Sequence, residues 1–90
     1  MQLTYPAIFT SFEEKDPGYT VVVPDLPGCV SEGNTLIEAI EMGTDAACGW
    51  ILGELEDGNE IPIPSDGDAF DISENSFVKF LLLDMDSYNV

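Results

Sequence analysis

The chain has 90 residues, and its 18 aspartates and glutamates are set against two lysines, with no arginine or histidine, giving a formal net charge of −16. This balance argues against independent nucleic-acid binding and against attachment to an anionic membrane, because both need cationic side chains. With 44% apolar residues the chain can still build the core of one small domain, and a folded acidic domain favours a basic partner.

Three strands are predicted in the first part of the chain. Residues 2–12 alternate with period two and are rich in aromatic and β-branched side chains, as strands are. Residues 13–18 are charged and end in Pro-Gly, which predicts a turn. Residues 19–23 then form the second strand of a hairpin, and residues 28–33 form a short third strand or edge segment.

The clearest element is a helix over residues 35–56. Thr35 followed by Glu38 has the form of a capping box, and apolar residues then recur at helical spacing. Asp57 and Gly58 are predicted to end the helix. Its solvated side is marked by Glu38, Glu41, Asp45 and Glu54.

The last third of the chain combines a long polar stretch with a very apolar one. Residues 57–75 are rich in Gly, Pro, Asp and Ser, and they are interpreted either as a loop or flap or as a binding segment. Residues 76–84 are almost continuously apolar, which is typical of a strand buried on both faces. One helix covers only one of those faces. The other face therefore needs a second subunit, a continuation of the chain or a partner protein.

These elements predict an α+β domain in the order β-β-β-α-β. A helix between the third and fourth strands favours a right-handed crossover. The expectation is a mixed sheet, with the last strand parallel to a neighbour and one main helix on one face.

The residue types leave little room for catalysis. Without histidine, neither a Ser-His-Asp nor a Cys-His arrangement can form within this chain. Cys29 and Cys48 are predicted to be buried thiols in a reducing cytosol, with a single disulfide as the alternative. The candidate Mg²⁺ ligands are Asp84 and Asp86 with Asp25 or Glu41, although eighteen acids bring some carboxylates together by chance. The prediction is no catalytic residue, no metal and no cofactor.

The segment Pro24-Asp25-Leu26-Pro27-Gly28-Cys29 is the most distinctive one, either as a rigid corner or as a presented loop. Two segments precede it, Tyr5-Pro6-Ala7-Ile8-Phe9 and Gly18-Tyr19-Thr20-Val21. It is followed by Gly33-Asn34-Thr35-Leu36-Ile37-Glu38-Ala39 and by Trp50. Further on come Ile61-Pro62-Ile63-Pro64-Ser65 and the stretch 80–86. In this order the segments cover nearly the whole chain, and together they resemble the HicB antitoxin family.

The resemblance implies a partial RNase H-like fold without RNase H activity. It also implies a partner, HicA, which is a small basic toxin that cleaves mRNA and that the antitoxin neutralises. Members of the family usually add a C-terminal DNA-binding domain. Because this chain stops at Val90 without a basic helix, residues 1–90 are expected to be one toxin-binding domain that lacks the DNA-binding domain.

The predicted function is masking of the toxin's RNA-binding and catalytic face by a cytoplasmic, homo-oligomeric antitoxin. Exposure and charge select the predicted toxin contacts: Asp25, Leu26, Pro27, Glu32 and Asn34, with the hairpin acids Glu13, Glu14 and Asp16. Two alternatives remain open. One is a degenerate metal-dependent nuclease using Asp25, Asp84 and Asp86, and the other is an acidic module that self-associates through its last strand.

Overall fold

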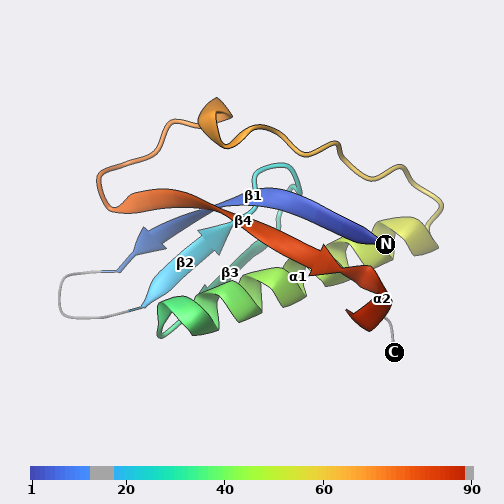
Figure 1. Cartoon of the computed structure of the whole chain (residues 1–90), viewed down its shortest axis with the longest axis horizontal. Coiled ribbons are helices and arrows are strands. Elements are labelled where there is room, and N and C mark those ends of the chain that lie inside the picture. Colours follow the sequence, from blue (N-terminus) through green and yellow to red (C-terminus); the bar gives the residue numbers. More distant parts are fainter. Residues whose placement is uncertain (13–17, 89–90) are drawn as a thin grey trace.

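Four strands form one sheet in the order β3-β2-β1-β4 (Figure 1). The structure is a computed structural model that describes residues 1–12 and 18–88, so the predicted turn at 13–18 falls mostly outside the described residues. The elements are β1 (Gln2–Ser11), β2 (Tyr19–Val22), β3 (Val30–Gly33), α1 (Leu36–Glu56), the 3-10 turn η1 (Gly67–Ala69), β4 (Ser76–Asp84) and α2 (Met85–Tyr88). The α+β class and the β-β-β-α-β order of the main elements are confirmed. The short helix α2 was not predicted.

The expected mixed sheet is wrong, because each of the three described pairings is antiparallel. β1 pairs with β2 on one side and with the whole of β4 on the other, from Gln2 opposite Asp84 to Thr10 opposite Ser76. The reason lies in residues 57–75, hereafter the crossing segment. After α1 has run the length of the sheet, this segment returns along it, so β4 starts at the opposite end from the one a direct crossover would give (Figure 1).

The ends of α1 follow the capping predictions. The Thr35 side chain accepts a hydrogen bond from the Glu38 N–H at 3.0 Å. The Glu38 carboxylate in turn accepts from the Asn34 N–H at 2.8 Å. At the other end Gly58 has a φ of +76°, which favours glycine, and the Asn59 N–H donates to the Glu54 carbonyl at 2.9 Å. Local residue chemistry therefore sets both ends of this helix.

The core lies between α1 and one face of the sheet. The backbone of α1 comes so close at Gly43 that a Cβ there would lie 2.9 Å from Val21 and 3.5 Å from Leu81. Phe9 of β1 stacks on Phe77 of β4 with ring centroids 5.4 Å apart. The largest fully buried side chains are Tyr5, Phe9, Leu26, Ile51, Leu81, Leu83, Val21, Val23 and Pro6. The small residues of the helix allow this close packing, as their spacing indicates.

The opposite face of the sheet is crossed by the crossing segment (Figure 1). The two faces of β4 differ in burial. Leu81 and Leu83 are buried, while Phe80 and Leu82 keep 49% and 57% of their surface exposed. The second face of this apolar strand is therefore covered only in part within the described chain.

The remaining sequence predictions concern cysteines and membrane spans. Cys29 and Cys48 are free and buried, which confirms the thiol prediction over the disulfide. Among the described helices, none combines the length and the apolar character that crossing a membrane requires.

Candidate interaction surface

The distinctive segment 24–29 is a rigid corner that is tied to the crossing segment. The Asp25 carboxylate accepts two hydrogen bonds from Ser65, one from the N–H at 2.8 Å and one from the hydroxyl at 2.6 Å. Beside it the Tyr5 hydroxyl donates to the Pro62 carbonyl at 2.5 Å. Burial, and to a smaller extent the negative charge of Asp25, raise the pKa of Tyr5 above its ordinary value. Together these contacts hold residues 62–65 in place.

Contacts within the segment also stabilise the corner. Gly28 has a φ of +83°, which allows the chain to reverse there, and the Cys29 N–H donates to the Leu26 carbonyl at 2.9 Å. Leu26 is completely buried, whereas the Pro27 carbonyl accepts from the Trp50 indole N–H of α1 at 2.9 Å. The segment is therefore a rigid corner, and it also presents one residue, Pro27, to the solvent. The two interpretations made from the sequence each hold in part.

The predicted partner contacts lie in different environments. Pro27, Glu32 and Asn34 are exposed, and Asp25 is half-buried and engaged by Ser65. Leu26 contributes to the core. The hairpin acids Glu13, Glu14 and Asp16 lie outside the described residues. A role in partner binding stays a prediction for each of these residues.

Removing the Asp25 carboxylate should loosen the crossing segment. We expect Asp25→Ala to lower the free energy of unfolding by about 1–3 kcal/mol, because the Ser65 N–H and hydroxyl lose their acceptor. Chemical denaturation measures this loss, and hydrogen exchange of the Ser65 amide reports whether the opening is local. Glu32→Ala is the matched control, since this exposed carboxylate should change stability by less than about 0.5 kcal/mol. Equal stability of the two variants would contradict the structural role of Asp25.

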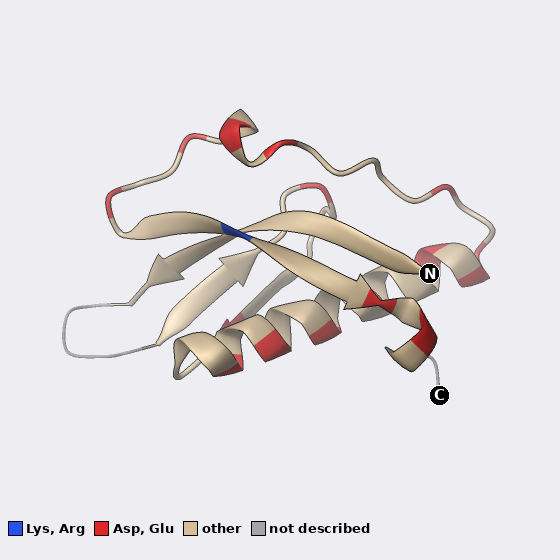
Figure 2. Cartoon of the chain, in the orientation of Figure 1, with Lys and Arg blue, Asp and Glu red and all other residues tan. Residues whose placement is uncertain are grey.

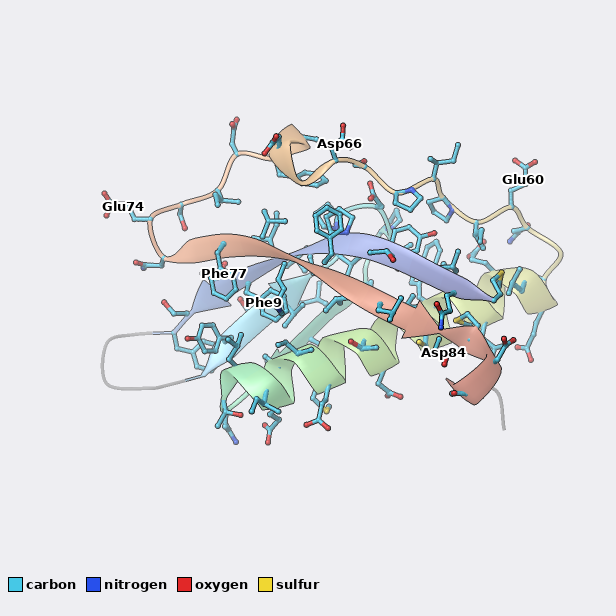
Figure 3. All side chains as sticks on the ribbon, viewed as in Figure 1. Phe9, Glu60, Asp66, Glu74, Phe77 and Asp84 are labelled. Carbon is cyan, nitrogen blue, oxygen red and sulfur yellow. The ribbon has the colours of Figure 1, made fainter. Side chains whose placement is uncertain are left out.

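Outside the sheet, acidic residues recur along α1 and along the crossing segment (Figure 2). One group follows the solvated side of α1, where Glu38, Glu41 and Asp45 are exposed, as predicted. A second group follows the crossing segment, and Figure 3 shows Glu60, Asp66 and Glu74 spaced along it. Lys79 is the single lysine or arginine in the described part of the chain. Such a surface attracts a basic partner and repels an acidic one.

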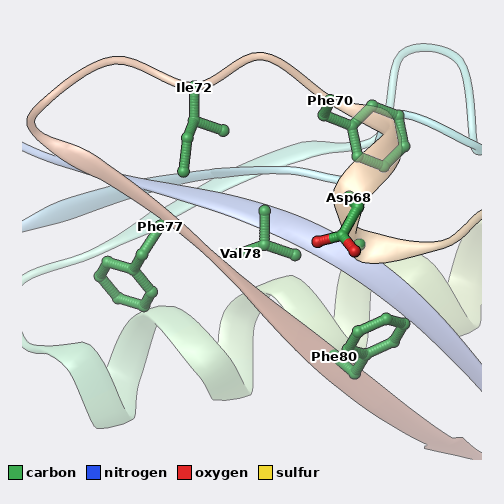
Figure 4. Close-up of a pocket in the computed structure, with 7 residues that line it drawn as sticks. Asp68, Phe70, Ile72, Phe77, Val78 and Phe80 are labelled. Carbon is green, nitrogen blue, oxygen red and sulfur yellow. The ribbon is translucent and has the colours of Figure 1, made fainter.

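An open groove of about 440 Å³ lies between the crossing segment and β4. Seven residues line this β4 groove: Gly67, Asp68, Phe70, Ile72, Phe77, Val78 and Phe80. Figure 4 shows that its walls are mostly aromatic and aliphatic, with one carboxylate. Sequence reasoning did not single out these residues as a site. The signal was present, because Phe70 and Ile72 are large apolar residues within an otherwise polar, acidic stretch.

Groups suited to catalysis are sparse. Burial raises the pKa of both thiols, and for Cys48 the nearby Asp45 and Asp84 raise it further, so the reactive thiolate is disfavoured. Of the carboxylates considered for Mg²⁺, Asp84 accepts from Ser87, and Asp86 pairs with the N-terminal amine at 2.6 Å. Within residues 1–12 and 18–88 no three metal-ligating side chains are grouped for an ion.

Sequence comparison matches residues 5–88 to a family described as HicB-like antitoxin of bacterial toxin-antitoxin systems. The chain is 36% identical over 83 residues to Antitoxin HicB 2 of Photorhabdus laumondii, covering 90% of this chain and 58% of that protein. It is also 48% identical over 50 residues to an uncharacterised 14.9 kDa protein of Haemophilus phage HP1, covering 56% of this chain and 38% of that one. The chain therefore spans between about two fifths and three fifths of the length of these relatives.

Solved structures share the fold. A chain of a toxin-antitoxin complex from Streptococcus pneumoniae superposes with a TM-score of 0.86 at 24% identity, covering 98% of this chain and 73% of that one. A chain of the HicA3 and HicB3 toxin-antitoxin complex gives 0.70 at 22% identity, covering 91% and 99%. At these identities the likeness extends to the architecture alone.

Proposed function

Since the chain belongs to the family of HicB-like antitoxins of bacterial toxin-antitoxin systems, we propose that it binds a small basic HicA-like toxin and neutralises it. The toxin's RNA-binding and catalytic face is masked in the complex, so mRNA can no longer enter. The observation that carries this proposal is the net charge of −16, much of which is carried by exposed carboxylates along α1 and the crossing segment.

Electrostatics gives the proposal its mechanism. A protein that grips RNA needs lysines and arginines to neutralise phosphates. A surface of carboxylates competes for those same cations, and its field speeds the encounter by steering the two proteins together. Occlusion of the toxin is sufficient, so the antitoxin contributes no reacting group of its own. Because the target is mRNA, the complex forms in the cytoplasm.

The proposed contacts include the exposed residues at the corner and at the start of α1. Pro27 lies at the corner, which Asp25 holds in a fixed position, while Glu32 and Asn34 lie at the end of β3 and just before the helix. The hairpin acids Glu13, Glu14 and Asp16 are proposed as further contacts. Leu26 supports this surface from inside the core, because it is fully buried.

RNA cleavage by a purified basic HicA-like toxin, with and without the chain, tests the proposal. We expect a saturating amount of the chain to abolish cleavage in moderate salt. The association rate constant should fall by about tenfold to a hundredfold between low and high salt, because added ions screen the charges that steer the encounter. Stopped-flow fluorescence measures this rate.

The dissociation rate constant serves as the internal control, because it should depend on salt far less than the association rate constant does. Undiminished RNA cleavage at saturating antitoxin would defeat the proposed function. An association rate that is independent of salt would remove the electrostatic part of the mechanism.

A further inference from the structure

β4 carries an apolar face that the described chain leaves largely open. Phe80 and Leu82 alternate with the buried Leu81 and Leu83, so they project from the side of the strand opposite the core. The crossing segment touches this face at Gly67, where a Cβ would lie 3.2 Å from the Phe80 ring and 3.4 Å from Val78. Even so, about half of Phe80 and more than half of Leu82 remain exposed, at 49% and 57%.

The β4 groove gives this face a concave shape. Phe70 and Ile72 form one wall, and Val78 and Phe80 form the other (Figure 4). Its volume of about 440 Å³ falls within the rough range of 300–1,000 Å³ for binding pockets, so an amino-acid side chain can enter it. A cluster of exposed aromatic and aliphatic groups around a hollow is the usual form of an interface centre.

The rim of the groove determines which partner fits. Four exposed acids follow one another along the crossing segment: Asp66, Asp68, Asp71 and Glu74. No lysine or arginine occurs between residues 57 and 75. A second copy of the chain would bring another net charge of −16 against these acids, and like charges at an interface are costly. A partner rich in lysine and arginine gains from the same contact.

The rim is also anchored to the corner through the chain. Ser65, which is bound by Asp25, directly precedes Asp66, the first acid of the rim. The two hydrogen bonds from Ser65 therefore fix where the rim begins.

From the open apolar face, the groove and its acidic rim, we propose that the β4 groove is the centre of the surface that holds the basic toxin. An apolar side chain of the toxin enters the groove and covers Phe80 and Leu82. Lysines or arginines beside that side chain pair with Asp66, Asp68 and Asp71 on the rim. This inference rests on the proposed function and gives it a location.

Binding of the same HicA-like toxin, measured by isothermal titration calorimetry, tests the location. Phe80→Asp should weaken binding by about 100-fold and Leu82→Asp by at least about tenfold, because each places a carboxylate at the apolar centre. The matched control is Met42→Asp in the middle of α1, where an apolar residue that is 47% exposed lies beside Glu41 and outside the proposed contacts. This variant should bind within about threefold of the unaltered chain.

Charge on the rim gives a second, independent readout. The double variant Asp68→Asn with Asp71→Asn should slow association by several-fold and reduce its salt dependence, while leaving the groove intact. Circular dichroism verifies that each variant is folded. If Phe80→Asp fails to fold, Leu82→Asp and the double variant decide the question.

Three outcomes would overturn the location. Normal binding by Phe80→Asp and Leu82→Asp, together with weak binding by Met42→Asp, would move the interface to the face of α1 and leave the proposed function standing. Sedimentation of the chain alone as a dimer that Phe80→Asp dissociates would make a second copy the occupant. Failure of the unaltered chain to bind or inhibit the toxin would defeat the proposed function itself.

Discussion

Gly33→Ala is expected to lower the free energy of unfolding by about 3 kcal/mol or more, because the new Cβ has no room. It would lie 2.3 Å from the Ala39 nitrogen, 2.7 Å from the Ala39 Cα and 2.7 Å from the Glu38 carbonyl carbon. All three are backbone atoms of the first turn of α1, which cannot rotate away as a flexible side chain can. The helix must therefore move off the end of β3, and overpacking of this kind costs at least about 1–3 kcal/mol even between side chains.

Urea denaturation followed by circular dichroism measures the loss. A domain of this size has roughly 5–13 kcal/mol of stability in total, so the change should move the midpoint far to lower urea. Gly53→Ala is the control with the opposite sign. Apart from the neighbouring backbone of α1 itself, no described atom lies within 4 Å of a Cβ at Gly53, so alanine there should stabilise the chain by about 0.5–1 kcal/mol. A Gly33→Ala variant as stable as Gly53→Ala would contradict the close approach of β3 and α1.

Ile51→Ala is expected to lower the free energy of unfolding by about 2–5 kcal/mol. Ile51 is fully buried on α1, within the cluster that includes Leu81 and Leu83 of β4. Alanine removes apolar contacts and leaves a cavity that the packed surroundings fill only in part. Because the cavity opens between helix and sheet, the loss affects the whole domain rather than one end of the helix.

Thermal and urea unfolding both report this change. Ile63→Ala is the matched control, since the same atoms are removed from a side chain that is 88% exposed on the crossing segment. Its effect on stability should stay within about 0.5 kcal/mol. If the two isoleucine variants lost stability equally, Ile51 would not occupy the core position assigned to it.

These stability effects bear on the antitoxin role. Close repulsion among the carboxylates destabilises the free chain, and a bound basic partner relieves it while adding buried surface. The core around Ile51 and the contact at Gly33 must therefore hold the domain together before the proposed partner binds. Variants of the β4 groove can separate binding from folding, because Phe80 and Leu82 are exposed in the free chain.

Much of the fold was predictable because it depends on neighbours in the sequence. Thr35 and Glu38 cap α1 across a single turn, and Gly58 ends the helix through its own backbone conformation. The strands are indicated by the alternation of apolar and polar residues and by apolar runs of the length typical of strands. The direction of β4 was mispredicted, because nothing local in residues 57–75 indicates that this segment returns along the sheet. The RNase H-like description and the homo-oligomer stay predictions.

The candidate site was predictable only in its chemistry. The charge of −16 indicated a basic partner, and the apolar run of residues 76–84 indicated a face in need of cover. The residues that line the groove could not be predicted from the sequence, because the path of the crossing segment brings Phe70 and Phe80 together. Asp25 was interpreted as a partner contact, yet its carboxylate binds Ser65, which is 40 residues away in the chain.

By itself, the sequence determined the four strands and the main helix, the ends of that helix, the absence of histidine chemistry and the acidic character of the chain. Each of these depends on residue type and short-range spacing. The tertiary structure alone decided the antiparallel direction of β4, the anchoring of the corner by Asp25, the contact of Gly33 with α1 and the position of the groove. Each of these depends on the meeting of distant segments, where long-range packing and hydrogen bonding set the geometry.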